Sequence, residues 1–246
     1  MNPAVVAPVI ADQEIERLEA CASDGIYSAG VNTATNLYSA AIFRRWWQGT
    51  SVLEMGCGDG NTTRLLLDAF DDVTVIDGSR SLADKVAAEF PGVTVACDLF
   101  ERWEPGRTFD TIVLNHTIEH VHDPVEVLKH ASRWLAPGGV ICASVPNARS
   151  LHRQAAVIMG MLPSEDSLTP SDVRAGHRRV SSPESFRAMF VEAGLRVDHS
   201  GGYWIKPLSN AQTDEWFTDE MIDAFLALGE RYPDIAAENY VIASRA

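Results

Sequence analysis

The stretch Ser51-Val-Leu-Glu-Met-Gly-Cys-Gly-Asp-Gly-Asn61 decides the fold of this 246-residue chain. Its apolar start, residues 52–55, predicts a strand, and the three alternate glycines predict a tight turn into a helix over 62–70. Glycine lacks a Cβ and tolerates positive φ, so backbone N–H groups in such a turn can approach a ligand closely. The acidic Glu54 before the turn would repel a phosphate and attract a cationic or amine-bearing ligand.

Strands and helices alternate along most of the chain. Apolar runs predict further strands at 73–76, 93–96, 111–114, 140–145, 195–199 and 240–244. Helical patterns cover 12–22, 33–47, 81–90, 123–135, 183–193 and 218–231, and Pro137-Gly138-Gly139 predicts a turn into the strand at 140. Continuous apolar strands separated by helices predict a parallel sheet covered on both faces. We therefore expect a doubly wound α/β fold.

Residues 54–60, written E-M-G-C-G-D-G, resemble the first motif of the class I S-adenosylmethionine-dependent methyltransferases. The resemblance implies that a turn formed by Gly56, Cys57, Gly58 and Gly60 lies against the methionine part of the cofactor. It also implies that Glu54 sits near the cofactor's amino group, partly through water. The alternative is a nicotinamide-dependent oxidoreductase, whose fingerprint wants its third glycine one place later, where this chain has Asn61.

Two later strands also end in an acid, and ligands of doubly wound sheets bind beyond the carboxyl ends of the strands. The resemblance assigns Asp77, after strand 73–76, to the ribose hydroxyls, with Gly78 and Ser79 around it. It assigns Asp98 to the exocyclic amine of adenine, with the backbone N–H of Leu99 to the ring. The structural alternatives are a solvated loop aspartate at 77 and a loop cap at 98.

The segment 109–121, F-D-T-I-V-L-N-H-T-I-E-H-V, resembles the ubiquinone-biosynthesis-like branch of the same family, as does the Leu-x-Pro-Gly-Gly pattern at 135–139. The resemblance places Asn115 and His116 under the methionine and sulfonium of the cofactor. It implies a seven-stranded, mostly parallel, Rossmann-like sheet.

The string His116-x-x-Glu119-His120 also spells a metalloprotease-like motif, which requires a helix. Here it falls on a strand tip and a loop. Some relatives bind a divalent ion with two acids and a histidine at these positions, but His116 replaces the first acid. We predict no metal and expect loop hydrogen bonds from Glu119 and His120, with a weak metal site as the alternative.

The segment 146–180 interrupts the regular pattern and is expected to form a lid over the acceptor. Within it, Gly176-His177-Arg178-Arg179 resembles a G-H-x-R segment that borders the substrate pocket of small-molecule methyltransferases. His177 is the first candidate for a catalytic base or substrate hydrogen bond, and His116 is the second. The alternative for His177 is a cap of the helix that begins at Pro183.

Arginines concentrate in the same segment, and Arg149, Arg153 and Arg178 are candidate ligands of an anionic acceptor. The alternative is that they pair with the nearby acids, which are Glu165, Asp166 and Asp172. Tyr27 is expected to close over the cofactor, as N-terminal aromatic residues do in some relatives.

Composition limits the class of protein. The net charge of −14 argues against nucleic acid as a partner. No run approaches the length of a membrane span, the start has no basic leader, and the four cysteines show no C-x-x-C spacing. We expect a cytoplasmic monomer or homodimer without a membrane partner. Residues 1–246 form one domain, divided into a helical cap (1–48), a cofactor-binding core (49–145), the lid (146–180) and C-terminal helices and strands (181–246).

The predicted activity is methyl transfer from S-adenosyl-L-methionine to an oxygen or nitrogen of a small molecule, with an anionic compound or a specialised metabolite as the candidate acceptor. A second alternative is a relative that binds the cofactor without catalysis.

Overall fold

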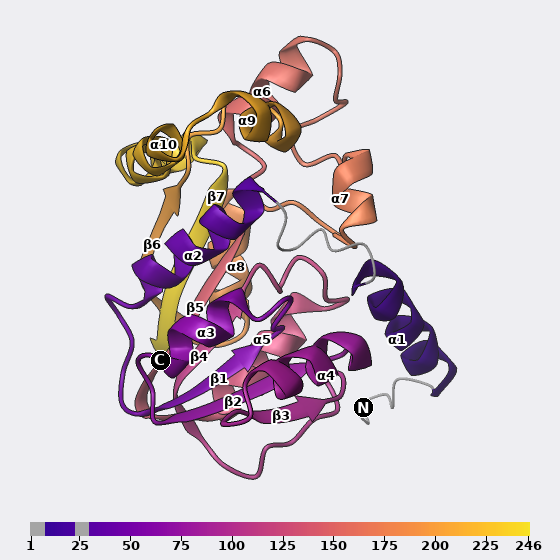
Figure 1. Cartoon of the computed structure of the whole chain (residues 1–246), viewed down its shortest axis with the longest axis vertical. Helices are drawn as coiled ribbons and strands as arrows, with labels where there is room; N and C mark the ends of the chain where they lie inside the picture. The colour runs from indigo at the N-terminus through magenta and orange to yellow at the C-terminus, as the bar shows by residue number, and fades with distance from the viewer. Residues whose placement is uncertain (1–7, 23–29) are drawn as a thin grey trace.

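A seven-stranded sheet in the order β3-β2-β1-β4-β5-β7-β6 forms the centre of the molecule (Figure 1). The computed structural model describes residues 8–22 and 30–246, with side chains from residue 12 on in the first range. All neighbouring strands are parallel except β7, which runs antiparallel to both β5 and β6. The strands are β1 (Ser51–Met55), β2 (Asp72–Asp77), β3 (Thr94–Cys97), β4 (Phe109–Asn115), β5 (Leu135–Pro146), β6 (Leu195–Tyr203) and β7 (Glu238–Arg245). The predicted doubly wound, mostly parallel sheet is confirmed.

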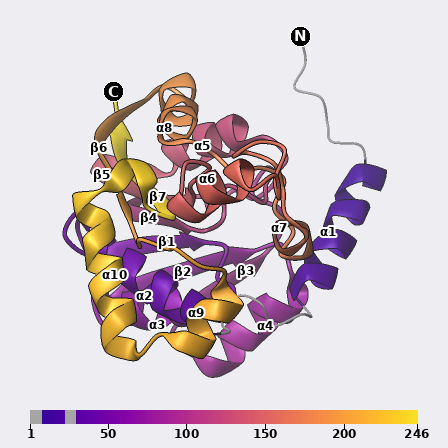
Figure 2. The ribbon, with the colours of Figure 1, turned by 90° about the horizontal axis from the view of Figure 1, so that it is seen from above.

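Helices cover both faces of the sheet (Figure 2). Helices α2, α3, α4 and α10 supply apolar side chains to one core, whereas α5 and α8 supply them to the other. The helices are α1 (Pro8–Ala22), α2 (Val31–Phe43), α3 (Asn61–Leu67), α4 (Arg80–Glu89), α5 (Pro124–Arg133), α6 (Leu151–Ile158), α7 (Pro170–Arg174), α8 (Pro183–Glu192), α9 (Asn210–Trp216) and α10 (Asp219–Arg231). None of those described is long and apolar enough to span a bilayer.

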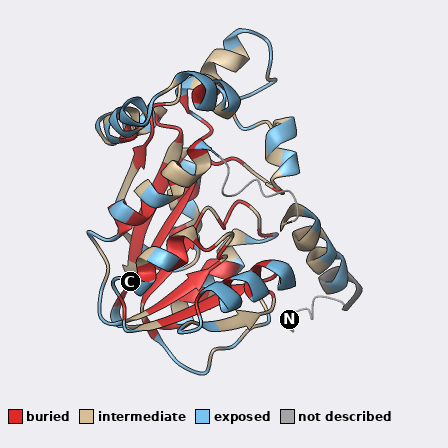
Figure 3. Cartoon of the chain, in the orientation of Figure 1, coloured by how far each residue is buried: buried red, intermediate tan, exposed pale blue. Residues whose placement is uncertain are grey.

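The central strands are buried on both faces, as the red strands of Figure 3 show. In β1, Val52 faces the core that contains α3 and α4, while Leu53 faces the core that contains α5. Both side chains are fully buried. Burial on both faces explains why these strands are continuous apolar runs in the sequence, because successive side chains point to opposite faces.

Several predicted boundaries differ from the structure, for example the helix over 62–70, which ends at Leu67, and the strand over 195–199, which continues to Tyr203. The helix expected over 33–47 ends at Phe43, and the next residues form tighter i→i+3 turns, such as the bond from Trp46 N to Phe43 O. The turn at 137–139 lies inside β5 rather than before it. Leu135 pairs with Phe109 and Val140 with Thr111, so the intervening residues form an irregularity within one long strand.

The order of the strands reverses between β1 and β4, and the glycine turn after β1 meets the loop after β4 at this point. Ligands of open α/β sheets bind at such a switch point, outside the carboxyl ends of the strands. The fold therefore brings the motif residues of 54–60 and 115–121 to one place, although about 60 residues separate them in the chain.

Candidate functional site

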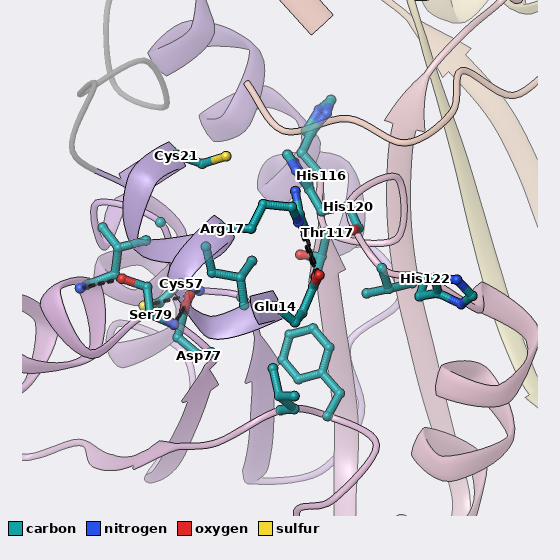
Figure 4. Close-up of a pocket in the computed structure, with 18 of the residues that line it drawn as sticks. Glu14, Arg17, Cys21, Cys57, Asp77, Ser79, His116, Thr117, His120 and His122 are labelled. Carbon is teal, nitrogen blue, oxygen red and sulfur yellow. Dashed lines mark hydrogen bonds and ion pairs between the residues drawn. The ribbon is translucent and has the colours of Figure 1, made fainter. Parts of the chain in front are cut away.

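A cavity of about 1130 Å³ opens at the switch point, between the carboxyl ends of the strands and helix α1 (Figure 4). It is large enough for a nucleoside-sized ligand together with a second small molecule. The predicted residues that line it are Gly56, Cys57, Gly58, Asp77, Gly78, Ser79, Asp98, Leu99, Asn115, His116 and Arg178. Glu54 and Gly60 are buried behind this lining. Tyr27 lies outside the described residues.

The glycine turn depends on backbone conformations that other residues rarely adopt. Gly56 has φ +84°, and a Cβ there would lie 2.7 Å from Thr117 Oγ1. Gly60 has φ +83° and is the N-cap of α3. Positive φ and close approach are both needed to turn the chain sharply from β1 into α3. The turn consequently presents its backbone to the cavity at Gly56, Cys57 and Gly58.

Glu54 is a buried carboxylate with one satisfied oxygen. Thr63 Oγ1 donates to its Oε2 at 2.5 Å, whereas Oε1 is buried without a hydrogen-bond partner in the described part of the chain. Burial raises the pKa of Glu54 to about 8, and the charge of Asp77 adds to this rise against the Thr63 bond. A buried acceptor without a donor costs free energy. The orphaned Oε1 therefore fits the cationic amino group of a ligand, reached directly or through a water.

Asp77 links the end of β2 to the glycine turn. Its Oδ2 accepts from Cys57 N at 2.9 Å, and its Oδ1 accepts from Ser79 N at 2.8 Å (Figure 4). Burial raises the pKa of Asp77, although these bonds act against the rise. At the end of β3, Asp98 Oδ1 accepts from Leu99 N and from the side chain of Arg102. Both carboxylates retain acceptor capacity toward hydroxyl or amine groups in the cavity.

Asn115 at the tip of β4 has all its side-chain atoms bonded. Its Oδ1 accepts from Ser39 Oγ and Ser144 Oγ, both at 2.7 Å, and its Nδ2 donates to Thr62 Oγ1 and Asn36 O. These bonds join β4, β5, α2 and α3. Asn115 therefore fixes the floor of the cavity.

His116 follows Asn115 with φ +53°, a conformation that is unusual for any residue except glycine. Its Nε2 lies 2.9 Å from Tyr203 Oη, and its Nδ1 lies 3.4 Å from Glu119 Oε1 and 3.9 Å from Glu238 Oε2. Burial lowers the pKa of His116, but the two carboxylates more than offset this, and the net shift is upward. Backbone strain at such a position is a feature of functional sites.

A second cluster lies beside His116. Ligand atoms of Glu119, His120 and His177 lie within 4.8 Å of one another, so this is where a divalent cation would find one carboxylate and two imidazoles. Burial lowers the pKa of His120 to about 4, which leaves its ring neutral. The pKa of Glu119 falls to about 2 because His116 and the other histidines outweigh the opposing effect of burial.

Three predicted ligands of the acceptor do not line the cavity: His177, Arg149 and Arg153. His177 Nδ1 lies 3.3 Å from Asp172 Oδ1, and its ring packs edge-on against His120. Arg153 is buried and binds Asp172 and the carbonyl of Glu165, which is the alternative that the sequence left open. Arg149 pairs with Glu184 on the surface. His177 and Arg153 therefore pair with an acid of the 146–180 segment itself, and Arg149 pairs with an acid just beyond it.

The sequence predicted a helical cap over residues 1–48, but it did not identify which residues of α1 line the cavity. Glu14, Arg17 and Leu18 all line it, and a Cβ on Gly78 would lie 2.4 Å from Leu18 Cδ1. Nothing in the chain around 12–22 resembles a motif; an i,i+3 Glu–Arg pair on a helix is common on any protein surface. Only the docking of α1 beside α4 gives these residues a place in the site.

Arg179 was also missed as a positioning residue. Its Nη1 donates to Ile118 O at 3.1 Å and Val121 O at 2.5 Å, and its Nη2 donates to His122 O at 2.9 Å. One guanidinium thus satisfies three carbonyls of the loop after β4. Because His120 and His122 of that loop line the cavity, Arg179 holds part of its wall in place.

The family model described as methyltransferase domain matches residues 13–200. The chain is 25% identical over 201 residues to a trans-aconitate 2-methyltransferase of Klebsiella pneumoniae, covering 77% of each chain. It is 29% identical over 188 residues to a ubiquinone biosynthesis O-methyltransferase of Paramagnetospirillum magneticum, covering 73% of this chain and 71% of the relative. A solved S-adenosylmethionine-dependent methyltransferase of Thermotoga maritima, a possible histamine N-methyltransferase, superposes with a TM-score of 0.68. It is 16% identical, over 95% of this chain and all of that one.

Proposed function

Because this chain belongs to the methyltransferase domain family, of the class I S-adenosylmethionine-dependent kind, we propose that it methylates an oxygen or nitrogen of a small acidic molecule, with His116 as the base. The family match decides against the nicotinamide-dependent alternative. S-Adenosyl-L-methionine is its cofactor, and the orphaned Oε1 of Glu54 and the glycine turn fit the amino-acid end of that molecule. When bound, the cofactor supplies an activated methyl group on a sulfonium.

The observation that carries this proposal is the position of His116. It lines the same cavity as the glycine turn and the strand-end acids, at the tip of β4. An acceptor hydroxyl must lose its proton as the new bond to the methyl group forms, and an ammonium must lose one before it can attack; a histidine is suited to accept that proton near neutral pH. The carboxylates of Glu119 and Glu238, at 3.4 and 3.9 Å, would stabilise the imidazolium that results.

A His116→Gln variant tests the proposal. With any turned-over acceptor we expect kcat to fall by about 10²–10⁴, a much larger change than that in the affinity for S-adenosylhomocysteine measured by calorimetry. Because the pKa of His116 is raised, wild-type kcat should decrease as the pH falls through a value above 6.5. His199→Gln is the matched control, since His199 stacks on Trp46 away from the cavity. Unchanged turnover in His116→Gln would refute the role of the base.

Metal-assisted transfer at Glu119, His120 and His177 is the alternative chemistry, favoured by the close approach of their ligand atoms. We retain the prediction of no metal because two of the three candidate ligands already face another titratable side chain, although neither oxygen of Glu119 has a hydrogen-bond partner in the described residues. Glu119 faces His116, and His177 faces Asp172 at 3.3 Å. His120 lines the cavity and His177 packs behind it. An acceptor would therefore have to extend past His120 to form a hydrogen bond with His177.

The nature of the acceptor is supported from two sides. Relatives of this chain are named for trans-aconitate, which is a tricarboxylate. In addition, Arg178, one of the arginines that line the cavity, is a suitable partner for a carboxylate. All four cysteines are free thiols, which supports a reducing compartment such as the cytoplasm. Light scattering of the purified protein would test the prediction of a monomer or homodimer.

A further inference from the structure

We propose that the guanidinium of Arg178 is the binding site for a carboxylate of the acceptor, and that Glu14 and Arg17 of helix α1 are its positioning residues. This inference rests on the proposed function and names the chemical class of the acceptor more closely. It concerns three side chains that all line the cavity and come from segments about 160 residues apart.

The guanidinium of Arg178 is fixed by two bonds and has donors to spare. Its Nε donates to His120 O at 3.0 Å, and its Nη2 donates to Glu14 Oε2 at 2.5 Å. In the described part of the chain, Nη1 makes no hydrogen bond or ion pair. The end of the fork, formed by Nη1 and the second N–H of Nη2, can therefore receive both oxygens of one carboxylate.

Arg17 holds the resident carboxylate of this cluster. Its Nη2 donates to Glu14 Oε1 at 2.7 Å and to His120 O at 3.0 Å, and its Nη1 donates to Gly176 O at 2.9 Å. Arg17 is thus bonded on several sides, whereas Arg178 has an unused edge. Glu14 orients Arg178 from one side, which reduces the entropy that a ligand must pay to order the fork.

The charges of the cluster do not cancel. Two guanidinium groups share one carboxylate, so this cluster of Glu14, Arg17 and Arg178 carries one excess positive charge in a cavity whose remaining lining is rich in acids. The neighbouring acid of the loop, Glu119, lies 3.4 Å from His116 Nδ1, and neither of its oxygens accepts a hydrogen bond from the described residues. A carboxylate of the acceptor would complete the cluster without displacing Glu14.

The carboxylate site and the proposed base are attached to one loop. Arg178 N donates to Glu119 O at 2.9 Å, and both arginines bond His120 O, four residues after His116. Figure 4 shows Glu14, Arg17, His116 and His120 around the same cavity. An acceptor anchored on Arg178 would therefore be held at a fixed distance from His116, and its geometry would select which hydroxyl or amine is methylated.

The test uses the full chain saturated with S-adenosylhomocysteine and four carboxylate probes, trans-aconitate, tricarballylate, citrate and benzoate, each compared with its neutral methyl ester by calorimetry. We expect wild type to bind at least one acid and to bind it more tightly than the ester. Arg178→Gln should weaken that binding by about tenfold or more. Glu14→Gln keeps an acceptor oxygen for Arg178 but removes a charge, so it should tighten binding severalfold.

The opposite signs of the two changes separate recognition from folding, since a merely structural role would make both variants weaker. Arg196→Gln is the control, because Arg196 forms a similar pair with Asp198 on β6 and should leave binding unchanged. Equal binding of acid and ester by wild type, no binding of any acid, or equal binding by Arg178→Gln would overturn the carboxylate site. If S-adenosylhomocysteine still bound, the proposed methyl transfer would survive that result; if it did not bind, both proposals would fail.

Discussion

Binding of the cofactor should release a proton from Glu54. Burial raises the pKa of this carboxyl to about 8, so at pH 7 about 0.9 of the folded molecules carry the proton before the ligand arrives. The ammonium of S-adenosylhomocysteine favours the carboxylate and should lower that pKa below 6. Binding at pH 7 should therefore release about 0.9 protons, and the affinity of wild type should rise about tenfold between pH 6 and pH 7.

Calorimetry in two buffers of different ionisation enthalpy measures the released proton directly. Glu54→Gln keeps the shape of the side chain and an oxygen for the bond from Thr63, but it has no proton to lose. Ionising Glu54 at pH 7 costs about 1.4 kcal/mol, and a charged hydrogen bond contributes about 1.5–3 kcal/mol. The two terms nearly cancel at pH 6, so the affinities of wild type and variant should converge there and differ by tenfold or more at pH 8.

Stability should follow the same linkage in the absence of ligand. Because the folded-state pKa of Glu54 lies above the unfolded value, its contribution to the free energy of unfolding is complete below about pH 4.5 and is lost as the pH rises toward 8. Glu54→Gln should be less sensitive to pH across that window. Equal proton release by wild type and Glu54→Gln would refute the assignment of Glu54 to the amino group of the cofactor.

Three further outcomes are expected. Gly56→Ala should abolish detectable binding of S-adenosylhomocysteine and lower the free energy of unfolding by about 2 kcal/mol. The reason is that φ of Gly56 is +84° and the new Cβ would collide with Thr117. Full binding of S-adenosylhomocysteine in a titration would contradict this prediction. Arg153→Met should lower the free energy of unfolding in urea by about 3 kcal/mol, because it leaves Asp172 without its buried partner. The affinity for the cofactor should stay constant. A higher KM for the acceptor at unchanged stability would instead indicate that Arg153 binds the substrate. Dialysis against a chelator should leave turnover unchanged, and elemental analysis should find no stoichiometric metal. Loss of activity on dialysis, followed by its recovery on addition of a divalent cation, would instead support a metal site at Glu119, His120 and His177.

Local sequence was sufficient to predict the part of the cavity that we assign to the cofactor. The glycines after β1 and the acids that end β2 and β3 are short-range features, since each stands at the carboxyl end of an apolar run. A parallel sheet places all such ends at one edge. The residues expected there, from Gly56 to His116, accordingly lie around one cavity.

The residues that we assign to the acceptor could not be predicted from local sequence in the same way. His177 and Arg153 have side chains suited to an acceptor, but in the structure both pair with Asp172 of the same segment. The 146–180 segment has no regular hydrophobic period, so its sequence does not predict which side chains face the cavity. Arg178 and Arg179 are adjacent in sequence yet differ in role, because one lines the cavity and the other binds loop carbonyls.

By itself, the sequence determined the doubly wound sheet, the family and the strand ends that surround the cavity, because these depend on residues that are close along the chain and on strand polarity. Only the tertiary structure decided which side chains of α1 line the cavity, that Glu14 meets Arg17 and Arg178, and that His116 faces two carboxylates. Those contacts join segments with no shared pattern, and they arise from packing across the whole molecule.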